Sequence, residues 1–440
     1  MVIGVTMKYK TFFTILIGCI LFTTTSISAI DVKLSVQSPQ STQIDNDIVA
    51  MIEQIDENLV FMYLNALMSF GPRYTGSDNC SRAGQYIFDE FEKMGLDTAF
   101  HEWRYDGFAD RNVVGTLAGS NSPNNAEILF CAHYDCTPGS LGADDDGSGV
   151  AAVMAAASVM SNYSFNHTIK FVAFSGEEVG TYGSFSYARD AYLHGNNVYA
   201  VLNADMVGYA DTAAGGNILR FFTVERSSWI AEYARDITES YHNFLDMKIE
   251  ILPNHMGADH QAFLDYGFDG VWIAHHDNYP YANTPDDNPE HLNRSYQVKA
   301  TKTILAICAE MAKKPIELQV QLTNPLEGCL YLRKHPIMPL DFLAKYWYKG
   351  LRGDTILLGR TMATADVFAT EEVKYVIFCI DDYFIHWDYD PPYEWNIQGK
   401  YSPIYGKHTL DVYAITESGK MSSDEMDIFI ITISSAYGPF

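Results

Sequence analysis

Four short apolar runs between residues 127 and 274 alternate with segments of helical periodicity, and this alternation restricts the possible folds more than any other feature. The runs are Glu127 to Ala132, Ile169 to Phe174, Asn197 to Leu202 and Gly270 to Ala274. The expected helices between them are Val150 to Met160, Tyr182 to Leu193 and Trp229 to Tyr241. Strands and helices in alternation predict an α/β domain with a mostly parallel mixed sheet and helices on both faces.

Polar residues follow each apolar run at the point where the strand is expected to end. The clusters are His133-Tyr134-Asp135, Gly176-Glu177-Glu178, Asn203-Ala204-Asp205 and His275-His276-Asp277. Ligands and catalytic groups in open α/β sheets gather at the carboxyl ends of the strands. A single cluster could be a helix cap or a hydrogen-bonded structural histidine, but four together favour a metal or catalytic site.

Three consecutive carboxylates, Asp144, Asp145 and Asp146, stand within the stretch Gly142 to Gly149, directly before the first expected helix. A helix cap would account for one of these acids, because a side-chain oxygen can accept a hydrogen bond from the free amides at a helix start. A cation would account for all three, because it removes the repulsion between clustered oxygen ligands. This stretch alone leaves both interpretations open.

The N-terminal 29 residues have the layout of a secretory signal peptide. Lys8 and Lys10 precede an apolar run from Phe12 to Phe22, and small residues follow up to Ala29. The apolar run is too short to span a bilayer comfortably. We therefore expect a secreted or extracytoplasmic protein, with membrane contact only through the signal peptide or, if Cys19 is a lipoprotein cleavage site, through a lipid anchor.

Charge and cysteine content exclude some functional classes and leave other properties open. The net charge of −26 disfavours nucleic-acid binding, because the field of the protein repels phosphate. The spacing of the cysteines after the leader predicts neither a small disulfide framework nor a CxxC zinc site, so their pairing is open. Oligomeric state cannot be predicted from this sequence. The six cysteines are Cys80, Cys131, Cys136, Cys308, Cys329 and Cys379.

The C-terminal segment has a different pattern, which begins after a helix expected from Ser295 to Ala312 and the linker-like Lys313-Lys314-Pro315. Strands in which the side chains alternate between two faces are expected at Ile316 to Leu322, Val373 to Ile380 and His408 to Ile415. In the last of them Leu410, Val412 and Ala414 share one face, as in a strand of a small β-sandwich. The expected domains are therefore residues 30–314, an α/β domain, and residues 315–440, an all-β module.

Five signatures between Asn46 and Ala312 appear together in this chain. They are His133-Tyr134-Asp135, Gly142 to Gly149, Ser175 to Gly180, Asn203 to Met206 and Gly257-Ala258-Asp259-His260. In content and order they resemble the co-catalytic zinc exopeptidases, a family that includes secreted bacterial leucyl aminopeptidases, glutamate carboxypeptidases and glutaminyl cyclases. The C-terminal segments Val373 to Asp382, Pro392 to Trp395 and Gly406 to Ala414 are similar to Ig-like modules attached to secreted enzymes.

The resemblance implies a site for two zinc ions. His133 and Asp205 would bind the first ion, Asp145 would bridge it to the second, and Glu178 would bind the second. The family also has a cis peptide bond after the bridging acid, which would fall between Asp145 and Asp146.

The resemblance also implies a hydrolytic mechanism on peptide substrates. Glu177 would be the general base that takes a proton from the attacking water, and Asp135 would orient His133 through its other ring nitrogen. The leading hypothesis is an aminopeptidase that removes residues from peptide N-termini. A carboxypeptidase and a glutaminyl cyclase on the same fold are alternatives.

One position departs from the family pattern. The last zinc ligand of the family is a His within a His-Thr pattern followed by an acid, and the matching stretch Tyr281 to Asp287 has Asn283 instead. A carboxamide oxygen is a weaker zinc ligand than imidazole. Asn283 could bind weakly in an active enzyme, or His275, His276 or His291 could replace it. Alternatively, the chain could have lost turnover and kept only a peptide-binding role.

Overall fold

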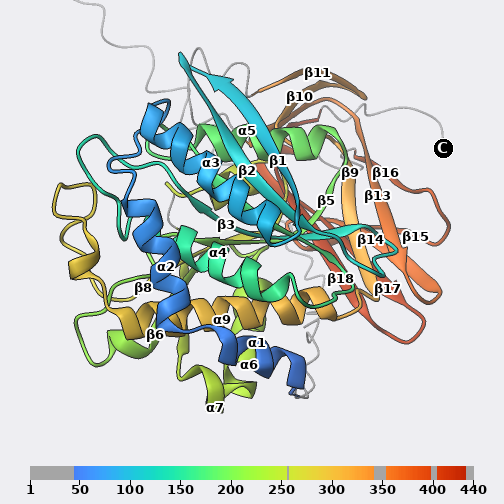
Figure 1. Cartoon of the computed structure of the whole chain (residues 1–440). Helices are drawn as coiled ribbons and strands as arrows, with labels where there is room; N and C mark the ends of the chain where they lie inside the picture. The colour runs from blue at the N-terminus through green and yellow to red at the C-terminus, as the bar shows by residue number, and fades with distance from the viewer. Residues whose placement is uncertain (1–43, 255–256, 341–352, 398–403, 433–440) are drawn as a thin grey trace, which may run out of the picture. The chain divides into compact units, whose positions relative to one another are not determined.

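The computed structural model describes residues 44–254, 257–340, 353–397 and 404–432 (Figure 1). The expected signal peptide, residues 1–29, lies outside these ranges. Within them, no helix combines the length and the apolar character needed to cross a membrane. All six cysteines after the leader are buried, and Cys80, Cys131, Cys136 and Cys308 are not in disulfide bonds.

Within the described residues, the α/β part is built on an eight-stranded sheet with the order β1-β2-β4-β3-β5-β8-β6-β7. The central strands β4, β3, β5 and β8 are parallel to one another, whereas β1, β2 and β6 form antiparallel pairs. The predicted mixed sheet is therefore confirmed. The strands are β1 (Asp97–Tyr105), β2 (Phe108–Leu117), β3 (Ala126–His133), β4 (Thr168–Phe174), β5 (Asn197–Ala204), β6 (Ile218–Thr223), β7 (Lys248–Pro253) and β8 (Gly270–His275).

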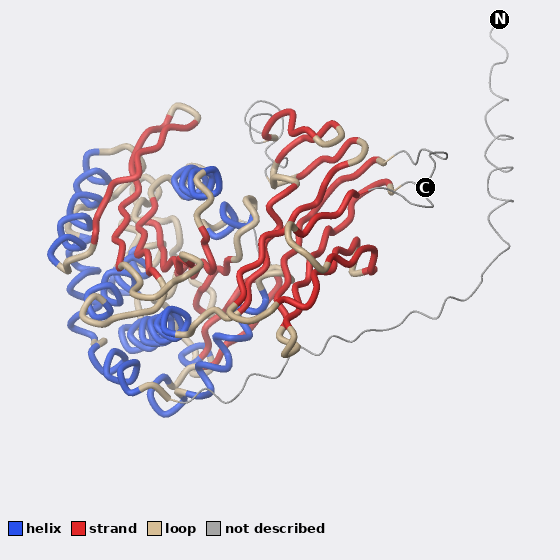
Figure 2. Tube along the Cα trace, turned by 90° about the vertical axis from the view of Figure 1, so that its right-hand side faces the viewer, coloured by secondary structure: helices blue, strands red, loops and turns tan. Residues whose placement is uncertain are grey.

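Helices cover both faces of this sheet, as predicted (Figure 2). In β3, Ile128 and Phe130 join the core on one face, whereas Leu129 and Cys131 join the core on the other. A strand buried on both faces needs a continuous apolar run, which is the pattern that the sequence has there. The helices on the first face are α1 (Asn46–Gln54), α2 (Glu57–Met68), α3 (Asp78–Lys93), α4 (Gly147–Met160), α6 (Ser228–Ser240) and α9 (Arg294–Lys313); α5 (Tyr182–Leu193) and α8 (His260–Leu264) lie on the second.

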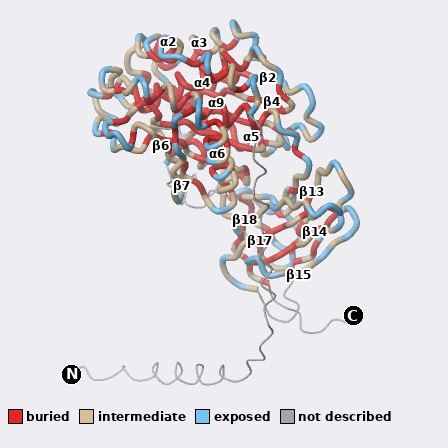
Figure 3. The backbone as a smooth tube through the Cα atoms, turned by 90° about the horizontal axis from the view of Figure 1, so that it is seen from below, coloured by how far each residue is buried: buried red, intermediate tan, exposed pale blue. Residues whose placement is uncertain are grey.

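Helix α4 starts at the triple-aspartate stretch and is buried along almost its whole length (Figure 3). Its residues are mainly Ala, Val, Gly and Met. Small side chains on every side allow the helix to pack against β3, α2 and α9 at the same time. The start of α4 is therefore held rigidly at the carboxyl end of β3.

Helix α3 is capped by Ser77, whose Oγ accepts the Cys80 amide at 3.2 Å. The antiparallel hairpin of β1 and β2 was not predicted. The sequence does contain the Asp-Gly pair that is typical of a hairpin turn. Asp106 and Gly107 form this turn and have positive φ, 49° and 86°.

The C-terminal residues 318–431 form two further sheets within the described ranges. Their orders are β11-β10-β12-β18-β17-β14-β15 and β16-β13-β9. The sheets share one hydrophobic core, to which Leu410, Val412 and Ala414 contribute as their alternation predicted. An Ig-like topology is not established, and the domain boundary after residue 314 stays a prediction. The strands are β9 (Leu318–Asn324), β10 (Cys329–Leu332), β11 (His335–Pro339), β12 (Thr355–Leu358), β13 (Thr361–Ala369), β14 (Val373–Ile380), β15 (Tyr383–Asp388), β16 (Tyr393–Ile397), β17 (Tyr405–Thr416) and β18 (Met421–Ile431).

Candidate metal centre

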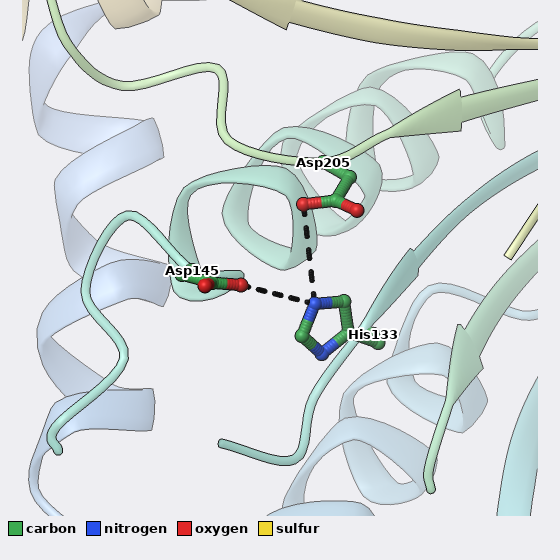
Figure 4. Close-up of side chains that lie close together, drawn as sticks. All are labelled: His133, Asp145 and Asp205. Carbon is green, nitrogen blue, oxygen red and sulfur yellow. Dashed lines mark ion pairs between the residues drawn. The ribbon is translucent and has the colours of Figure 1, made fainter. Parts of the chain in front are cut away.

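Three of the predicted ligands come together at the carboxyl edge of the central strands (Figure 4). His133 ends β3, Asp205 directly follows β5, and Asp145 lies in the loop before α4. His133 Nε2 lies 3.3 Å from Asp145 Oδ1 and 3.9 Å from Asp205 Oδ1. One donor atom from each of the three lies within 4.8 Å of the others, and all three residues are buried.

The donor atoms of this cluster fit a zinc ion. His133 Nε2 is buried and has no hydrogen-bond partner. The other ring nitrogen, Nδ1, lies 3.2 Å from the backbone oxygen of Asp135 and 3.5 Å from its Oδ1, so that side of the ring can hold the proton. Two ligands bound tetrahedrally to zinc at about 2.1 Å lie about 3.4 Å apart. The separation of His133 Nε2 from Asp145 matches this value closely.

The neighbouring acid Asp146 shapes the loops around the cluster. Its Oδ1 accepts the amides of Gly149 at 3.0 Å and Met206 at 3.1 Å, and its Oδ2 accepts the amide of His133 at 3.1 Å. Asp146 therefore caps α4 and also ties together the three segments that carry the candidate ligands. The peptide bond between Asp145 and Asp146 is cis, which confirms the expectation from the resemblance.

The third acid of the stretch, Asp144, is fully buried and has a different set of partners. Its Oδ1 accepts the Gly208 amide at 2.8 Å, and its Oδ2 lies 2.9 Å from His275 Nε2. Asp144 therefore shapes the loop through hydrogen bonds and leaves Asp145 as the acid of the three that faces His133.

Asp135 connects the end of β3 to the loop that carries the two glutamates. Its Oδ1 accepts the Glu177 amide at 3.2 Å, and its Oδ2 accepts the Glu178 amide at 3.3 Å and the Thr75 hydroxyl at 2.7 Å. No local pattern in the sequence indicated Thr75, because its partner lies 60 residues away. These contacts hold Glu177 and Glu178 beside His133.

Both glutamates ionise less readily than a free carboxyl group. Burial, reinforced by repulsion from Asp259 and Asp205 and opposed by His133, raises the pKa of Glu177 well above its ordinary value. Burial also raises the pKa of Glu178 to about 7, with His133 opposing and Asp145 adding to the shift. A cation near these carboxylates would lower both pKa values.

The predicted second metal position is less complete than the first. Glu178 Oε1 is buried without a hydrogen-bond partner, which leaves it available to an ion beside Asp145. Glu178 is nevertheless absent from the cluster formed by His133, Asp145 and Asp205 in the described ranges. Asn283 is exposed on a turn, with φ of 60°.

The three histidines considered as substitutes for Asn283 all have other partners. His275 pairs with Asp144, and His276 Nδ1 lies 2.9 Å from Glu250 Oε2. The ring of His291 stacks on Tyr281, with centroids 3.8 Å apart. These contacts give no support to a histidine in place of Asn283.

In the metal-free protein, we expect the free energy of unfolding to fall as the pH rises from about 4 to 8. Burial raises the pKa of Asp205 to about 8 and that of Glu178 to about 7. A carboxyl whose pKa is raised by folding contributes stability below its unfolded pKa and loses it as the pH rises through the folded pKa. Denaturant unfolding of chelator-treated protein at several pH values measures this fall.

Added zinc should remove most of this pH dependence, because zinc binds the deprotonated ligands and releases their protons. A metal-free protein that is equally stable at pH 5 and pH 8 would contradict the electrostatic description of the site.

Comparisons with known proteins find relatives among peptidases and zinc metalloproteases. Residues 112–308 match the model of peptidase family M28. A probable leucine aminopeptidase of Arthroderma otae is 22% identical over 314 residues, which cover 67% of this chain and 81% of the relative. A probable zinc metalloprotease of Pyrenophora tritici-repentis is 24% identical over 337 residues, which cover 62% of this chain and 77% of the relative.

Solved structures share the fold of the α/β part. The LapA aminopeptidase of Legionella pneumophila superposes with a TM-score of 0.57 at 21% identity, over 64% of this chain and 79% of that one. A glutaminyl cyclase of Bacteroides thetaiotaomicron superposes with a TM-score of 0.52 at 20% identity, over 58% of this chain and 98% of that one. The match to peptidase family M28 spans residues 112–308, which contain the strands and loops that form the candidate metal cluster, and together with the aminopeptidase and metalloprotease relatives it identifies this chain as a metallo-exopeptidase.

Proposed function

We propose that this chain is an exported zinc-dependent aminopeptidase that hydrolyses N-terminal residues from peptides. His133, Asp145 and Asp205 would hold the zinc ion, and Glu177 would act as the general base. The observation that carries the proposal is the buried and unpartnered Nε2 of His133, which faces two carboxylates at 3.3 Å and 3.9 Å. Without a cation, the imidazole would have to take up a proton to pair with these acids; burial opposes this, but Asp135 and Asp145 raise the pKa of His133 well above its ordinary value.

The residues around the cluster can perform the proton transfers of peptide hydrolysis. A bound zinc ion would polarise the scissile carbonyl and lower the pKa of water at the site to about 7. Glu177 is half-buried, and its amide is anchored on Asp135 at 3.2 Å. Because its pKa is raised, Glu177 holds a proton taken from water long enough to deliver it to the leaving amine.

The charge of the site favours an N-terminal substrate over a C-terminal one. Glu177, Glu178, Asp145 and Asp205 surround His133, and a peptide ammonium group would be attracted to this negative field. A carboxypeptidase needs a cationic side chain to receive the terminal carboxylate. The guanidinium of the nearby Arg73 is fully buried and already donates to three backbone carbonyls.

The substrate end can be tested with a matched pair of peptides. The zinc-loaded protein is incubated with one peptide in its free form and in its N-acetylated form, and the products are identified by mass spectrometry. We expect stepwise loss of N-terminal residues from the free peptide only. Release from the C-terminus would support a carboxypeptidase, and loss of ammonia from an N-terminal glutamine would support a cyclase.

A catalytically silent peptide-binding protein is the second candidate, and Asn283 is the observation that favours it. Because this position holds asparagine, the second ion lacks the imidazole of the family pattern, and the side chain is exposed on a turn. A fully zinc-loaded protein that binds the free peptide without releasing any residue would establish this alternative and exclude turnover.

Replacing Asn283 with histidine is expected to increase the zinc stoichiometry from about one to about two ions per chain, because imidazole is a stronger zinc ligand than a carboxamide. Glu178 Oε1 is already buried and unpartnered and can complete the second position together with Asp145. Elemental analysis after dialysis against micromolar zinc measures the change, with Asn278→His as a control in the same loop. Equal stoichiometry in wild type and Asn283→His would contradict the weight given to this position.

Export is part of the proposal and rests on the leader sequence. Residues 1–29 combine lysines, a short apolar run and a small-residue end. N-terminal sequencing of the mature protein is expected to find a start near residue 30. A mature protein that still carries residues 1–29 would contradict export by this leader.

A further inference from the structure

The segment Leu141–Asp145, which carries the candidate bridging acid, lies between two buried side chains of opposite charge. On one side is Arg73, which is 0% exposed. Its Nε donates to the backbone oxygen of Tyr134 at 2.7 Å, its Nη1 to that of Leu141 at 2.6 Å and its Nη2 to that of Gly142 at 3.1 Å. This guanidinium is therefore bound to the carbonyl side of the loop.

On the other side is Asp287, which is also 0% exposed. Its Oδ1 accepts the amide of Asp144 at 2.8 Å, and its Oδ2 accepts the amide of Asp145 at 3.2 Å. Tyr279 donates its hydroxyl to Oδ1 of Asp287 at 2.7 Å, and the backbone oxygen of Asp287 accepts the Ala143 amide at 3.4 Å. The carboxylate is therefore bound to the amide side of the same loop.

Hydrogen bonds to a full charge are roughly twice as strong as neutral ones, and their strength grows in a buried environment. Arg73 holds carbonyl groups of the loop and Asp287 holds its amide groups. Together they fix the orientation of the peptide planes in the loop. Gly142 allows the close packing that this requires, because a Cβ there would lie 2.5 Å from the backbone oxygen of Asp145 and 2.6 Å from Cys136 Cβ.

We propose that Arg73 and Asp287 form a two-sided clamp on the backbone, and that this clamp positions Asp145 for metal binding. Neither residue is a ligand or touches the substrate; both act through the main chain of the loop. The clamp holds Asp145 Oδ1 at 3.3 Å from His133 Nε2, so that the ion meets a preorganised pair of donors. Loss of either charge lets the loop relax and weakens zinc binding.

This inference rests on the ligand role of Asp145 in the proposed function, so its test measures zinc affinity and does not depend on peptide turnover. A chelator competition titration compares wild type with Asp287→Asn, which keeps the size of the side chain and removes its charge. We expect zinc affinity to fall by about tenfold to a hundredfold, as for other residues that support metal ligands. The matched control is Asp286→Asn, an exposed acid one residue earlier, which should change the affinity by less than about twofold.

A double-mutant cycle separates positioning from general stability. In an Asp145→Ala background, Asp287→Asn should have no further effect on zinc affinity, because the ligand that the clamp positions is missing. An equal loss of affinity in both backgrounds would overturn the clamp and indicate general destabilisation. Unchanged affinity in Asp287→Asn alone would overturn it as well.

Arg73→Lys provides a second variant in case Asp287→Asn does not fold. It keeps the charge but loses the planar fork that reaches three carbonyls, so we expect about a tenfold loss of zinc affinity with the same dependence on Asp145. Thermal unfolding of each metal-free variant shows whether it is folded. If the wild-type protein binds no zinc, both the clamp and the proposed function are wrong. If the wild type binds zinc and the variants bind it with the same affinity, only the clamp is wrong.

Discussion

Replacing Glu177 with glutamine is expected to lower kcat for N-terminal residue release by a factor of about 10² to 10⁴, which is the usual contribution of a general base. The amide is nearly isosteric but cannot accept a proton from water at neutral pH. Because Glu177 is not among the clustered donor atoms, its replacement should leave the zinc content of the protein unchanged. Steady-state kinetics on the free peptide, with elemental analysis of the same sample, measure both quantities.

Glu290→Gln is a suitable control, because Glu290 is an exposed glutamate outside the metal cluster. It should keep wild-type kcat and KM. A Glu177→Gln variant that retains more than about a tenth of the wild-type kcat would exclude Glu177 as the general base. A variant that loses its zinc would instead indicate that Glu177 is a ligand.

Replacing Asp145 with asparagine is expected to weaken zinc binding by a factor on the order of 10² to 10³. Zinc sites in proteins contribute about 10 to 16 kcal/mol, and this change removes the charge of one of the three clustered donors. Peptide hydrolysis should be lost together with the metal. Chelator competition gives the affinity, and the kinetic assay gives the turnover at saturating zinc.

The neighbouring Asp144→Asn separates the two roles within the triple-aspartate stretch. Asp144 pairs with His275 and the Gly208 amide and does not belong to the donor cluster. We expect it to lower stability more than zinc affinity. If Asp144→Asn weakens zinc binding as strongly as Asp145→Asn does, the assignment of Asp145 as the ligand of the three is wrong.

The parts of the fold that follow from local pattern could be predicted from the sequence. The apolar runs became β3, β4, β5 and β8, because strands buried on both faces must be continuously apolar. Of the polar residues at their ends, His133 and Asp205 joined the candidate metal cluster, because parallel strands end at the same edge of a sheet. The same logic placed Leu410, Val412 and Ala414 in the core of the C-terminal sheets.

Other features depend on contacts that no local pattern encodes. Arg73 binds the carbonyl of Leu141, which is 68 residues away, and Thr75 binds Asp135, which is 60 residues away. In the sequence, Arg73 has the appearance of an ordinary loop arginine. Strand β1 was missed because its burial pattern has few fully buried positions, so its apolar periodicity is weak.

The central claim is that this chain uses zinc at the site of His133, Asp145 and Asp205 to release N-terminal residues. The most direct test is to strip the wild-type protein with a chelator, return zinc in measured equivalents, and follow release from the free peptide by mass spectrometry. The predicted result is no release without metal and recovery as the first equivalent binds, with no recovery in Asp145→Asn at the same zinc concentration. Release by the stripped protein, or equal recovery in wild type and Asp145→Asn, would contradict the claim.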